Sequence, residues 1–424
     1  MRILHLSWEY PPVVYGGLGR HVHALAEAQA ALGHDVVVIT QHQDDAALDE
    51  VVSGVRIVRV PQDPPQVPIS DMLAWVMGFD HTVARAGVRL AREWEPDVVH
   101  GHDWLITHAA ATMKTLFDVP LVATVHATEA GRHQGWLPDD ANKAIHSMEW
   151  WLTYEARRVI TCSSHMSWEV TRLFELPPDK VDVIPNGIDL DRWSVSDAAV
   201  AQARADLAPD GPLVVYSGRL EWEKGVHDLL EAMPELRRRH PGLRMAVVGD
   251  GTQADELARQ ADELGLTDVV TFVGWVEDED LVALAAAADV AVVPSIYEPF
   301  GLVALEAAAV GTPLVVADTG GLREFVEHGV TGLRFEARDV PALTDAVSAL
   351  IDDEVLARRL VRDARVVVSG DYSWEHVAAR TVEVYARSQR EEAALRLGQV
   401  GRGQRPVLVV RDGNLLAPWP SGSA

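Results

Sequence analysis

Residues 2–40 read RILHLSWEYPPVVYGGLGRHVHALAEAQAALGHDVVVIT, and the fold follows from this stretch. The runs Arg2–Ser7 and Asp35–Thr40 are short and mostly apolar, as parallel strands buried on both faces are. Between them, Gly17–Leu32 has the apolar spacing of a helix and stops at Gly33. A strand, a helix and a second strand in this order predict a βαβ unit with parallel strands.

The same alternation continues along the chain. Further strands are predicted at Asp97–His100, Leu121–Val125, Val159–Thr161 and Val181–Ile184, and helices at Ile69–Glu93 and Asp140–Arg157. The pattern restarts with strands at Leu213–Ser217, Met245–Gly249, Val269–Val273, Val290–Pro294 and Leu314–Ala317. Helices are predicted between them at Gly225–Arg239, Gln253–Leu264, Asp278–Ala287, Leu302–Val310 and Leu322–His328.

Two successive sets of βα units predict an α/β protein with two Rossmann-like, doubly wound domains. We place the first domain at 1–190 and the second at 191–373, with the boundary inside 186–211, where Pro, Asp and Gly interrupt the periodicity. A last helix is expected over 374–390, and 391–424 is expected to be a mobile tail.

Composition and charge exclude several classes of protein. The chain has 424 residues, of which 48% are apolar and 24% charged, as in folded globular proteins. Acidic residues outnumber basic ones by 63 to 37, and this net charge of −26 argues against nucleic-acid binding as the main activity. Cys162 is the single cysteine, which excludes an internal disulfide. The sequence has no secretory signal and no apolar run of about 20 residues, so we expect a cytoplasmic protein without stable membrane anchoring.

Ligands of open parallel sheets bind beyond the carboxyl ends of the strands, and glycine-rich segments follow the strands in both halves. Gly16 and Gly17 lie between the first strand and the first helix. Glycines there let the backbone approach a phosphate, and the helix N-terminus supplies N–H donors. The third glycine of the dinucleotide fingerprint is missing, and a simple tight turn is the alternative. Two such sheet edges facing each other would form an interdomain cleft.

Two cations, Arg219 and Lys224, follow the first strand of the second half. A guanidinium fork and an ammonium group both suit phosphate oxygens. We expect Lys224 to be exposed at the strand edge and therefore to add little stability. The alternative for both cations is surface ion pairing with Glu221 and Glu223.

Glu298 and Glu306 bracket a loop and the start of a predicted helix. The N–H groups of Gly301, Leu302 and Val303 would be free to meet a pyrophosphate, and Glu306 could accept two ribose hydroxyls. Eight residues at helical rise separate the glutamates by about 12 Å. Glycosidase carboxylates lie roughly 5 to 9.5 Å apart, so this pair fits one extended ligand better. The alternative is a pair of surface helix glutamates.

The histidines of the first half do not predict a metal site. Five of them lie in separate segments without H-E-x-x-H or Cys–His spacing, namely His100, His102, His108, His126 and His133. His126 directly ends a predicted strand, where an imidazole could hydrogen-bond a sugar hydroxyl or stabilise developing charge. The alternative is a structural histidine with satisfied hydrogen bonds.

Six motifs occur together in one order, YGGLGR, HDW, PNGID, GRLEWEKG, EPFGLVALE and TGGLRE. In this order they resemble the retaining nucleotide-sugar glycosyltransferases of family 4, and among them the glycogen-synthase-like members. The chain looks most similar to actinobacterial α-1,4-glucosyltransferases of glycogen and methylglucose lipopolysaccharide synthesis. The resemblance covers about residues 1 to 390.

The resemblance implies a GT-B fold, with two Rossmann-like domains facing across a cleft and the last helix crossing back to the first domain. It implies that glucose moves from ADP- or UDP-glucose to the non-reducing end of an α-1,4-glucan or methylglucose-type oligosaccharide. The anomeric configuration would be retained, and neither a metal nor another cofactor would be required. The leaving diphosphate itself would help to deprotonate the acceptor.

The resemblance also implies roles for residues of the second domain, where the donor would bind. Arg219 and Lys224 would hold the diphosphate, and Glu306 would bind the ribose. Glu298 and the backbone of Thr319, Gly320 and Gly321 would hold the glucose hydroxyls.

In the first domain, Asn186 and His126 match family positions that touch the sugar, and Asp103 matches an aspartate in the acceptor-side wall. Gly16 and Gly17 would approach the diphosphate from this side. Val14 departs from the family pattern, because bacterial glycogen synthases carry lysine at this position, so one phosphate contact is missing.

Two other functions remain open at this point. The same fold could serve a lipid or a small sugar phosphate acceptor. A lipid acceptor would favour a basic amphipathic helix in the first domain, whereas Gly17–Leu32 carries few cations. A non-catalytic sugar-nucleotide binder would have lost Arg219, Lys224 or Glu298, and all three are present. Nothing in the sequence predicts an oligomeric state.

Overall fold

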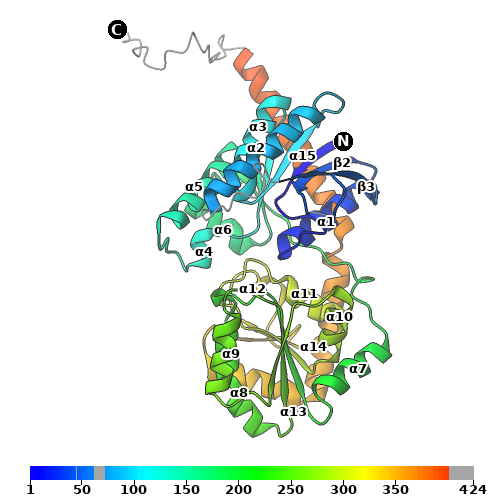
Figure 1. Cartoon of the computed structure of the whole chain (residues 1–424), viewed down its shortest axis with the longest axis vertical. Coiled ribbons are helices and arrows are strands. Elements are labelled where there is room, and N and C mark those ends of the chain that lie inside the picture. The colour runs from blue at the N-terminus through cyan, green and yellow to red at the C-terminus, as the bar shows by residue number, and fades with distance from the viewer. Residues whose placement is uncertain (44, 62–71, 401–424) are drawn as a thin grey trace.

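Two α/β domains lie one above the other along the long axis of the molecule (Figure 1). The computed structural model describes residues 1–43, 45–61 and 72–400. Each domain is built on a parallel sheet, and β3, at the edge of the first sheet, is antiparallel to its neighbour β4. The predicted α/β class with two parallel-sheet domains is confirmed.

The first sheet has eight strands in the order β3-β4-β2-β1-β5-β6-β7-β8. Its strands are β1 (Arg2–Leu6), β2 (Asp35–Gln41), β3 (Asp49–Val52), β4 (Val55–Val60), β5 (Val98–His102), β6 (Leu121–Val125), β7 (Arg158–Thr161) and β8 (Val181–Val183). The helices are α1 (Gly17–Ala31), α2 (Met72–Leu90), α3 (Thr107–Phe117), α4 (Glu129–Arg132), α5 (Asp140–Glu155) and α6 (Ser164–Leu173).

The second sheet has six strands in the order β11-β10-β9-β12-β13-β14. Its strands are β9 (Leu213–Ser217), β10 (Arg244–Val248), β11 (Val270–Gly274), β12 (Val290–Val293), β13 (Leu314–Ala317) and β14 (Leu333–Phe335). The helices are α7 (Asp197–Leu207), α8 (Val226–Arg239), α9 (Ala254–Glu263), α10 (Asp278–Ala287), α11 (Leu302–Val310), α12 (Leu322–Phe325), α13 (Val340–Asp352) and α14 (Glu354–Asp371).

Both sheets reverse their strand order beside their first strand. β1 lies between β2 and β5, and β9 lies between β10 and β12. At such a switch point the connections leave on opposite faces of the sheet, so the loops beyond the strand ends diverge and can bind a ligand. The glycine loop after β1 and the cationic segment after β9 both lie at these points.

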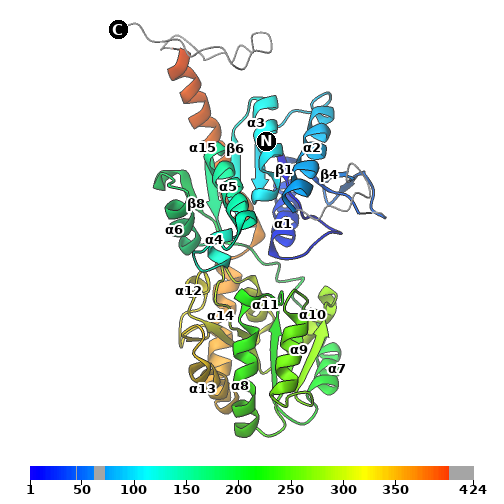
Figure 2. The ribbon, with the colours of Figure 1, turned by 60° about the vertical axis from the view of Figure 1, so that its left-hand side comes forward.

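The last helix, α15 (Trp374–Val400), returns from the second domain to the first (Figure 2). Its residues Val377, Val384 and Tyr385 are buried in one core with Val22 and Leu25 of α1. The helix therefore extends beyond its predicted end at residue 390, and residues 391–400 of the predicted mobile tail are helical. Residues 401–424 lie outside the described residues.

A β-hairpin formed by β3 and β4 was not predicted. Its turn is Ser53-Gly54, with φ of 50° and 81°, as the tight turns of two-residue hairpins require. The stretch DEVVSGVRIVRV at residues 49–60 mixes apolar residues with charged ones, whereas the strands predicted from the sequence were continuous apolar runs. The predicted helix Ile69–Glu93 is shorter at its C-terminal end, where α2 stops at Leu90, and its first three residues lie outside the described residues.

The carboxyl ends of the two sheets face each other (Figure 1). Side chains of the two domains form hydrogen bonds across this interface. The hydroxyl of Tyr297 donates to Glu169 Oε1 at 2.8 Å and accepts from the backbone N–H of Thr128 at 3.2 Å. Ser163 Oγ donates to the carbonyl of Pro299 at 2.7 Å. Within the described ranges, no helix is both long enough and apolar enough to cross a bilayer.

Candidate active site

A buried carboxylate holds the glycine loop after β1. Glu9 Oε2 accepts hydrogen bonds from the backbone N–H groups of Tyr15, at 2.8 Å, and Gly16, at 3.1 Å. Burial raises the pKa of Glu9. A Cβ atom on Gly17 would lie 2.9 Å from Leu302 Cδ1 in the second domain, which is closer than side chains normally come. The loop therefore lies directly against the start of α11.

Lys224 and Glu298 form an ion pair at the facing edge of the second domain. The distance from Lys224 Nζ to Glu298 Oε2 is 2.8 Å, and Ser295 Oγ donates to the same oxygen at 3.1 Å. The two charged side chains are only 15% and 13% exposed, so the expectation of an exposed Lys224 is wrong. A short 3-10 turn over Trp222–Lys224 ends at the lysine, whose side chain reaches Glu298 in the loop after β12.

Arg219 remains more accessible than Lys224. Its side chain is 44% exposed, and it lies 3.4 Å from Glu223. The alternative of an ion pair with a neighbouring glutamate therefore holds for Arg219, while Lys224 pairs across the sheet edge with Glu298 instead. A Cβ on Gly16 would be 3.8 Å from Arg219 Cδ, so the arginine borders the glycine loop of the other domain.

Three residues after β13 lie against the backbone next to Glu298. Gly321 N donates to the carbonyl of Glu298 at 2.9 Å, and Thr319 Oγ1 donates to the carbonyl of Ile296 at 3.1 Å. Gly320 has a φ of +49°, and a Cβ there would be 1.9 Å from the Glu298 carbonyl oxygen. Only glycine fits this close approach. The three residues thus fix the loop that carries the Glu298 carboxylate.

The start of α11 offers backbone N–H groups towards the first domain. Gly301, with a φ of +102°, precedes this helix. The N–H groups of Gly301, Leu302 and Val303 donate to none of the residues that the structure describes, which leaves them available to an anion. Glu306, one turn later, is buried and pairs with Arg20 Nη1 of the first domain at 2.8 Å. Burial raises the pKa of Glu306, and the nearby Arg20 opposes that rise.

Asp103 lies in a strained turn directly after β5. Its φ and ψ are 58° and 179°, a backbone conformation that residues other than glycine rarely adopt. Its Oδ1 accepts a hydrogen bond from the backbone N–H of His126 at 2.7 Å. Burial raises the pKa of Asp103 to about 6. A strained backbone and a shifted pKa at the end of a central strand are common features of active sites.

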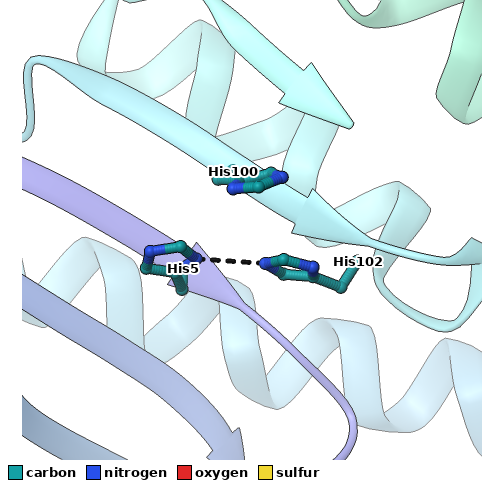
Figure 3. Close-up of side chains that lie close together, drawn as sticks. All are labelled: His5, His100 and His102. Carbon is teal, nitrogen blue, oxygen red and sulfur yellow. Dashed lines mark hydrogen bonds between the residues drawn. The ribbon is translucent and has the colours of Figure 1, made fainter. Parts of the chain in front are cut away.

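Behind His126 lies a cluster of histidines, which brings together His100, His102 and His126 although they come from separate segments, while His108 and His133 lie outside it. His5 Nδ1 and His102 Nε2 are 3.0 Å apart, with His100 alongside (Figure 3). His102 Nδ1 and His126 Nε2 are 3.3 Å apart. One nitrogen from each ring lies within 4.8 Å of the others in two triads, His5–His100–His102 and His21–His102–His126. Either triad has a spacing that could hold a metal ion.

Asn186 supports this cluster from its far side. Its Oδ1 accepts a hydrogen bond from His21 Nδ1 at 2.8 Å, and the rings of His21 and His126 are 4.7 Å apart. Burial lowers the pKa of His126 to about 3 and the pKa of His5 to about 4, so both rings are neutral near pH 7. The cluster is therefore uncharged.

Sequence reasoning missed several residues of this site. Arg20 closes the YGGLGR motif and Glu9 is the first acidic residue after β1, so both carried a positional signal. His5 is a single histidine in an otherwise mostly apolar strand, and nothing in the sequence around it indicated a functional role. The β1–β5 register pairs His5 with His100, and this pairing brings the two residues together.

Two family models match this chain, one in each half. The model of the family "Glycosyltransferase Family 4" matches residues 15–192, and that of "Glycosyl transferases group 1" matches residues 200–367. The chain is 47% identical over 404 residues to glycogen synthase of Mycobacterium tuberculosis, covering 92% of this chain and 96% of the relative. It is 33% identical over 403 residues to D-inositol 3-phosphate glycosyltransferase of Nocardia farcinica, covering 92% and 88%.

A solved structure shows the same fold along nearly the whole chain. Sucrose-phosphate synthase of Thermosynechococcus elongatus superposes with a TM-score of 0.79 at 27% identity, covering 91% of this chain and 98% of that one. The expected GT-B architecture and the resemblance to glycogen-synthase-like enzymes are thereby confirmed. With the similarity running through both domains, the chain belongs to the family 4 glycosyltransferases.

Proposed function

We propose that this enzyme transfers glucose from ADP- or UDP-glucose to the non-reducing end of an α-1,4-glucan or a methylglucose-type oligosaccharide, with retention of configuration. Two findings support the proposal. One is the identity to a glycogen synthase over nearly the whole chain. The other is the arrangement of charge at the facing edge of the second domain.

That arrangement carries the proposal. Arg219, Lys224 and the open N–H groups at the start of α11 gather on one side of the domain interface. As the bond between glucose and diphosphate breaks, negative charge develops on the leaving oxygen, and preorganised cations and N–H dipoles stabilise it there. The same groups would hold the diphosphate while it accepts the proton of the attacking hydroxyl. These residues supply positive charge without a metal ion.

Other residues would orient the sugar and the nucleoside. Glu298, held by Lys224 and Ser295, would accept hydrogen bonds from glucose hydroxyls, and Glu306 would accept those of the ribose. In this structure Glu306 pairs with Arg20. When the donor binds, Arg20 and the ribose hydroxyls would therefore share the Glu306 carboxylate. On the first-domain side, His126 and Asn186 would contact the sugar and Asp103 would border the acceptor.

The test is a donor and acceptor screen. The purified enzyme is incubated with ADP-glucose, UDP-glucose or GDP-mannose over malto-oligosaccharides, and nucleotide release and chain extension are followed. We expect release with a glucose donor only, together with a product that is longer by one α-1,4-linked glucose. Release without chain extension, or release with GDP-mannose alone, would contradict the proposal.

A second acceptor class has its own support. The Nocardia farcinica relative is a D-inositol 3-phosphate glycosyltransferase, which favours a small phosphorylated acceptor. The same screen should therefore include inositol phosphate, and transfer to it in place of the glucan would select this alternative. We also propose a cytoplasmic location, where sugar nucleotides would be available.

A further inference from the structure

An unbroken series of hydrogen bonds runs from the last helix to His126. Gln29 Nε2 donates to Tyr385 of α15 at 3.1 Å, and Gln29 Oε1 lies 2.8 Å from His5 Nε2. His5 Nδ1 lies 3.0 Å from His102 Nε2, and His102 Nδ1 lies 3.3 Å from His126 Nε2. Gln29, His5 and His102 are completely buried, so water cannot replace these bonds.

The order of these bonds fixes where each proton lies. Gln29 Oε1 can only accept, so His5 carries its proton on Nε2 and its Nδ1 is a lone pair. That lone pair accepts from His102 Nε2, which leaves His102 Nδ1 as the next lone pair. His126 must then donate from Nε2. Because burial keeps the rings neutral, each one holds a single proton, and His126 Nδ1 is left without one.

We propose that Gln29, His5 and His102 are positioning residues that hold His126 in the tautomer protonated at Nε2, which leaves Nδ1 to accept a hydrogen bond from a hydroxyl of the transferred sugar. The part concerning the sugar rests on the proposed function. Unlike the two rings and the amide behind it, His126 is partly exposed, and its Nδ1 makes no hydrogen bond with the described residues.

The reverse arrangement differs in the orientation of the Gln29 amide. If Gln29 were turned to donate to His5, every proton in the series would move, and His126 Nε2 would become a lone pair. Asn186 Oδ1 accepts from His21 Nδ1, so His21 Nε2 is itself a lone pair, buried and without a partner in the described chain. One nitrogen of His21 lies within 4.8 Å of one nitrogen each of His102 and His126. In either arrangement one of the two facing nitrogens of His102 and His126 carries the proton and the other is a lone pair, so His21 does not select between them and the orientation of Gln29 does.

Tyr385 accepts the hydrogen bond of the Gln29 amide. Its hydroxyl lies 2.6 Å from His100 Nδ1, and His100 Nε2 lies 2.7 Å from Thr124 Oγ1. Because Gln29 Nε2 donates to this hydroxyl, Oε1 of the same amide points to His5 and the hydroxyl proton remains available to His100. A residue of the last helix therefore acts on the site through Gln29.

Nuclear magnetic resonance of the ¹⁵N-histidine-labelled full chain tests the tautomer directly. The two nitrogens of His126, identified by comparison with His126→Gln, differ in chemical shift according to which one carries the proton. We expect a protonated Nε2 and a bare Nδ1. A protonated Nδ1 would overturn the proposal whatever the activity screen shows, so this failure is distinguishable from failure of the proposed function.

Gln29→Met retains the length of the side chain and removes the acceptor. We expect the second tautomer of His126 to appear, and kcat/KM for the sugar nucleotide to fall about two- to tenfold, the usual effect of losing one neutral hydrogen bond. Tyr385→Phe, a milder change, should shift the tautomer in the same direction and serves if Gln29→Met does not fold. An unchanged tautomer in the folded variant would refute the positioning role.

Ser348→Ala is the matched control. It removes a buried hydrogen bond to His240, at 3.0 Å, in the second domain. We expect both the tautomer of His126 and kcat/KM to stay as in the parent enzyme. Spectra before and after treatment with EDTA should coincide. A joint shift of the His102 and His126 signals on chelation would overturn the proposal, because a metal ion would then occupy the nitrogens assigned here to hydrogen bonds.

Discussion

The two sheet edges that face each other at the domain interface are built from opposite kinds of group. The edge of the first domain presents a neutral histidine cluster whose rings burial keeps uncharged. The edge of the second domain presents ions, with Lys224 against Glu298 and Arg219 beside Glu223. Neutral rings can tell a hydroxyl donor from an acceptor, whereas ions respond to charge at longer range. On the proposed function, the cations of the second domain would stabilise the diphosphate, and the neutral rings of the first domain would contact the sugar opposite Glu298.

Asp103 is a carboxyl group on the first-domain edge, where burial raises its pKa and the nearby Arg132 opposes that rise. Because Asp103 accepts a hydrogen bond from the backbone N–H of His126, its ionisation tests how strongly this edge disfavours a charge. The four predictions below break or sharpen the contrast between the edges.

Lys224→Ala should have the largest effect, because it removes charge stabilisation from the second-domain edge. We expect kcat to fall on the order of 100- to 1000-fold. Loss of the partly buried ion pair should also lower the free energy of unfolding by about 1 to 3 kcal/mol. Both are measured by steady-state kinetics and urea unfolding.

The control for that variant is Lys114→Ala. Lys114 pairs with Glu155 at 2.9 Å in the first domain, away from the facing sheet edges. Its loss should leave kcat unchanged. If Lys224→Ala retained nearly full activity in a folded protein, the diphosphate would have to be bound elsewhere.

Asp103→Asn should change how stability depends on pH. Burial raises the pKa of Asp103 from 3.8 to about 6, so the folded state binds this proton more tightly than the unfolded state does. The parent protein should therefore lose stability as the pH rises from about 4 to about 6, by roughly 3 kcal/mol from this group. Asparagine keeps the oxygen that accepts from His126 N and should remove that loss.

Urea unfolding at several pH values between 4 and 7 checks this prediction. The difference in unfolding free energy between variant and parent should grow in favour of Asp103→Asn across that range and then level off. Parallel curves would mean that the carboxyl titrates normally and that the first-domain edge is not as apolar as the contrast requires.

Gly17→Val should push the two edges apart. The added side chain would meet Leu302, from which a Cβ alone is only 2.9 Å away. A shift of about 1 Å in the position of reacting groups costs roughly 100-fold in rate, so we expect a fall of that order in kcat/KM with little change in melting temperature. Gly370→Val adds the same side chain where nothing lies within 4 Å and is the control. Wild-type kinetics for Gly17→Val would show that the loop does not border the donor.

EDTA should have no effect on transfer. The second-domain edge supplies its own cations, and the first-domain nitrogens bond to one another. Activity is compared before chelation, after chelation and after each of several divalent ions is restored. A loss of activity that metal reverses would show that the histidine cluster binds a metal ion. The first-domain edge would then carry a charge, and the contrast between the two edges would be wrong.

The sequence predicts the charged edge far better than the neutral one. Lys224, Glu298 and Thr319–Gly321 lie in short motifs after apolar strands, so spacing along the chain locates them. His5, His21 and Gln29 lie inside regular elements and meet only through sheet register and helix packing. Such contacts have no local signature, because each partner is an ordinary residue of its own strand or helix. The burial of Lys224 was missed for the same reason, since its partner is 74 residues away along the chain.

The return of α15 to the first domain has a consequence for synthesis on the ribosome. All eight strands of the first sheet have been made by Val183, yet its core with α1 is completed only by Val377, Val384 and Tyr385. Translation of the intervening segment of roughly 200 residues takes about 10 to 40 s at typical rates. During that time the nascent first domain exposes an apolar groove along α1, and the second domain can fold before the first is closed. The half that is translated first is therefore the half that is finished last, and its exposed groove is where a chaperone would act.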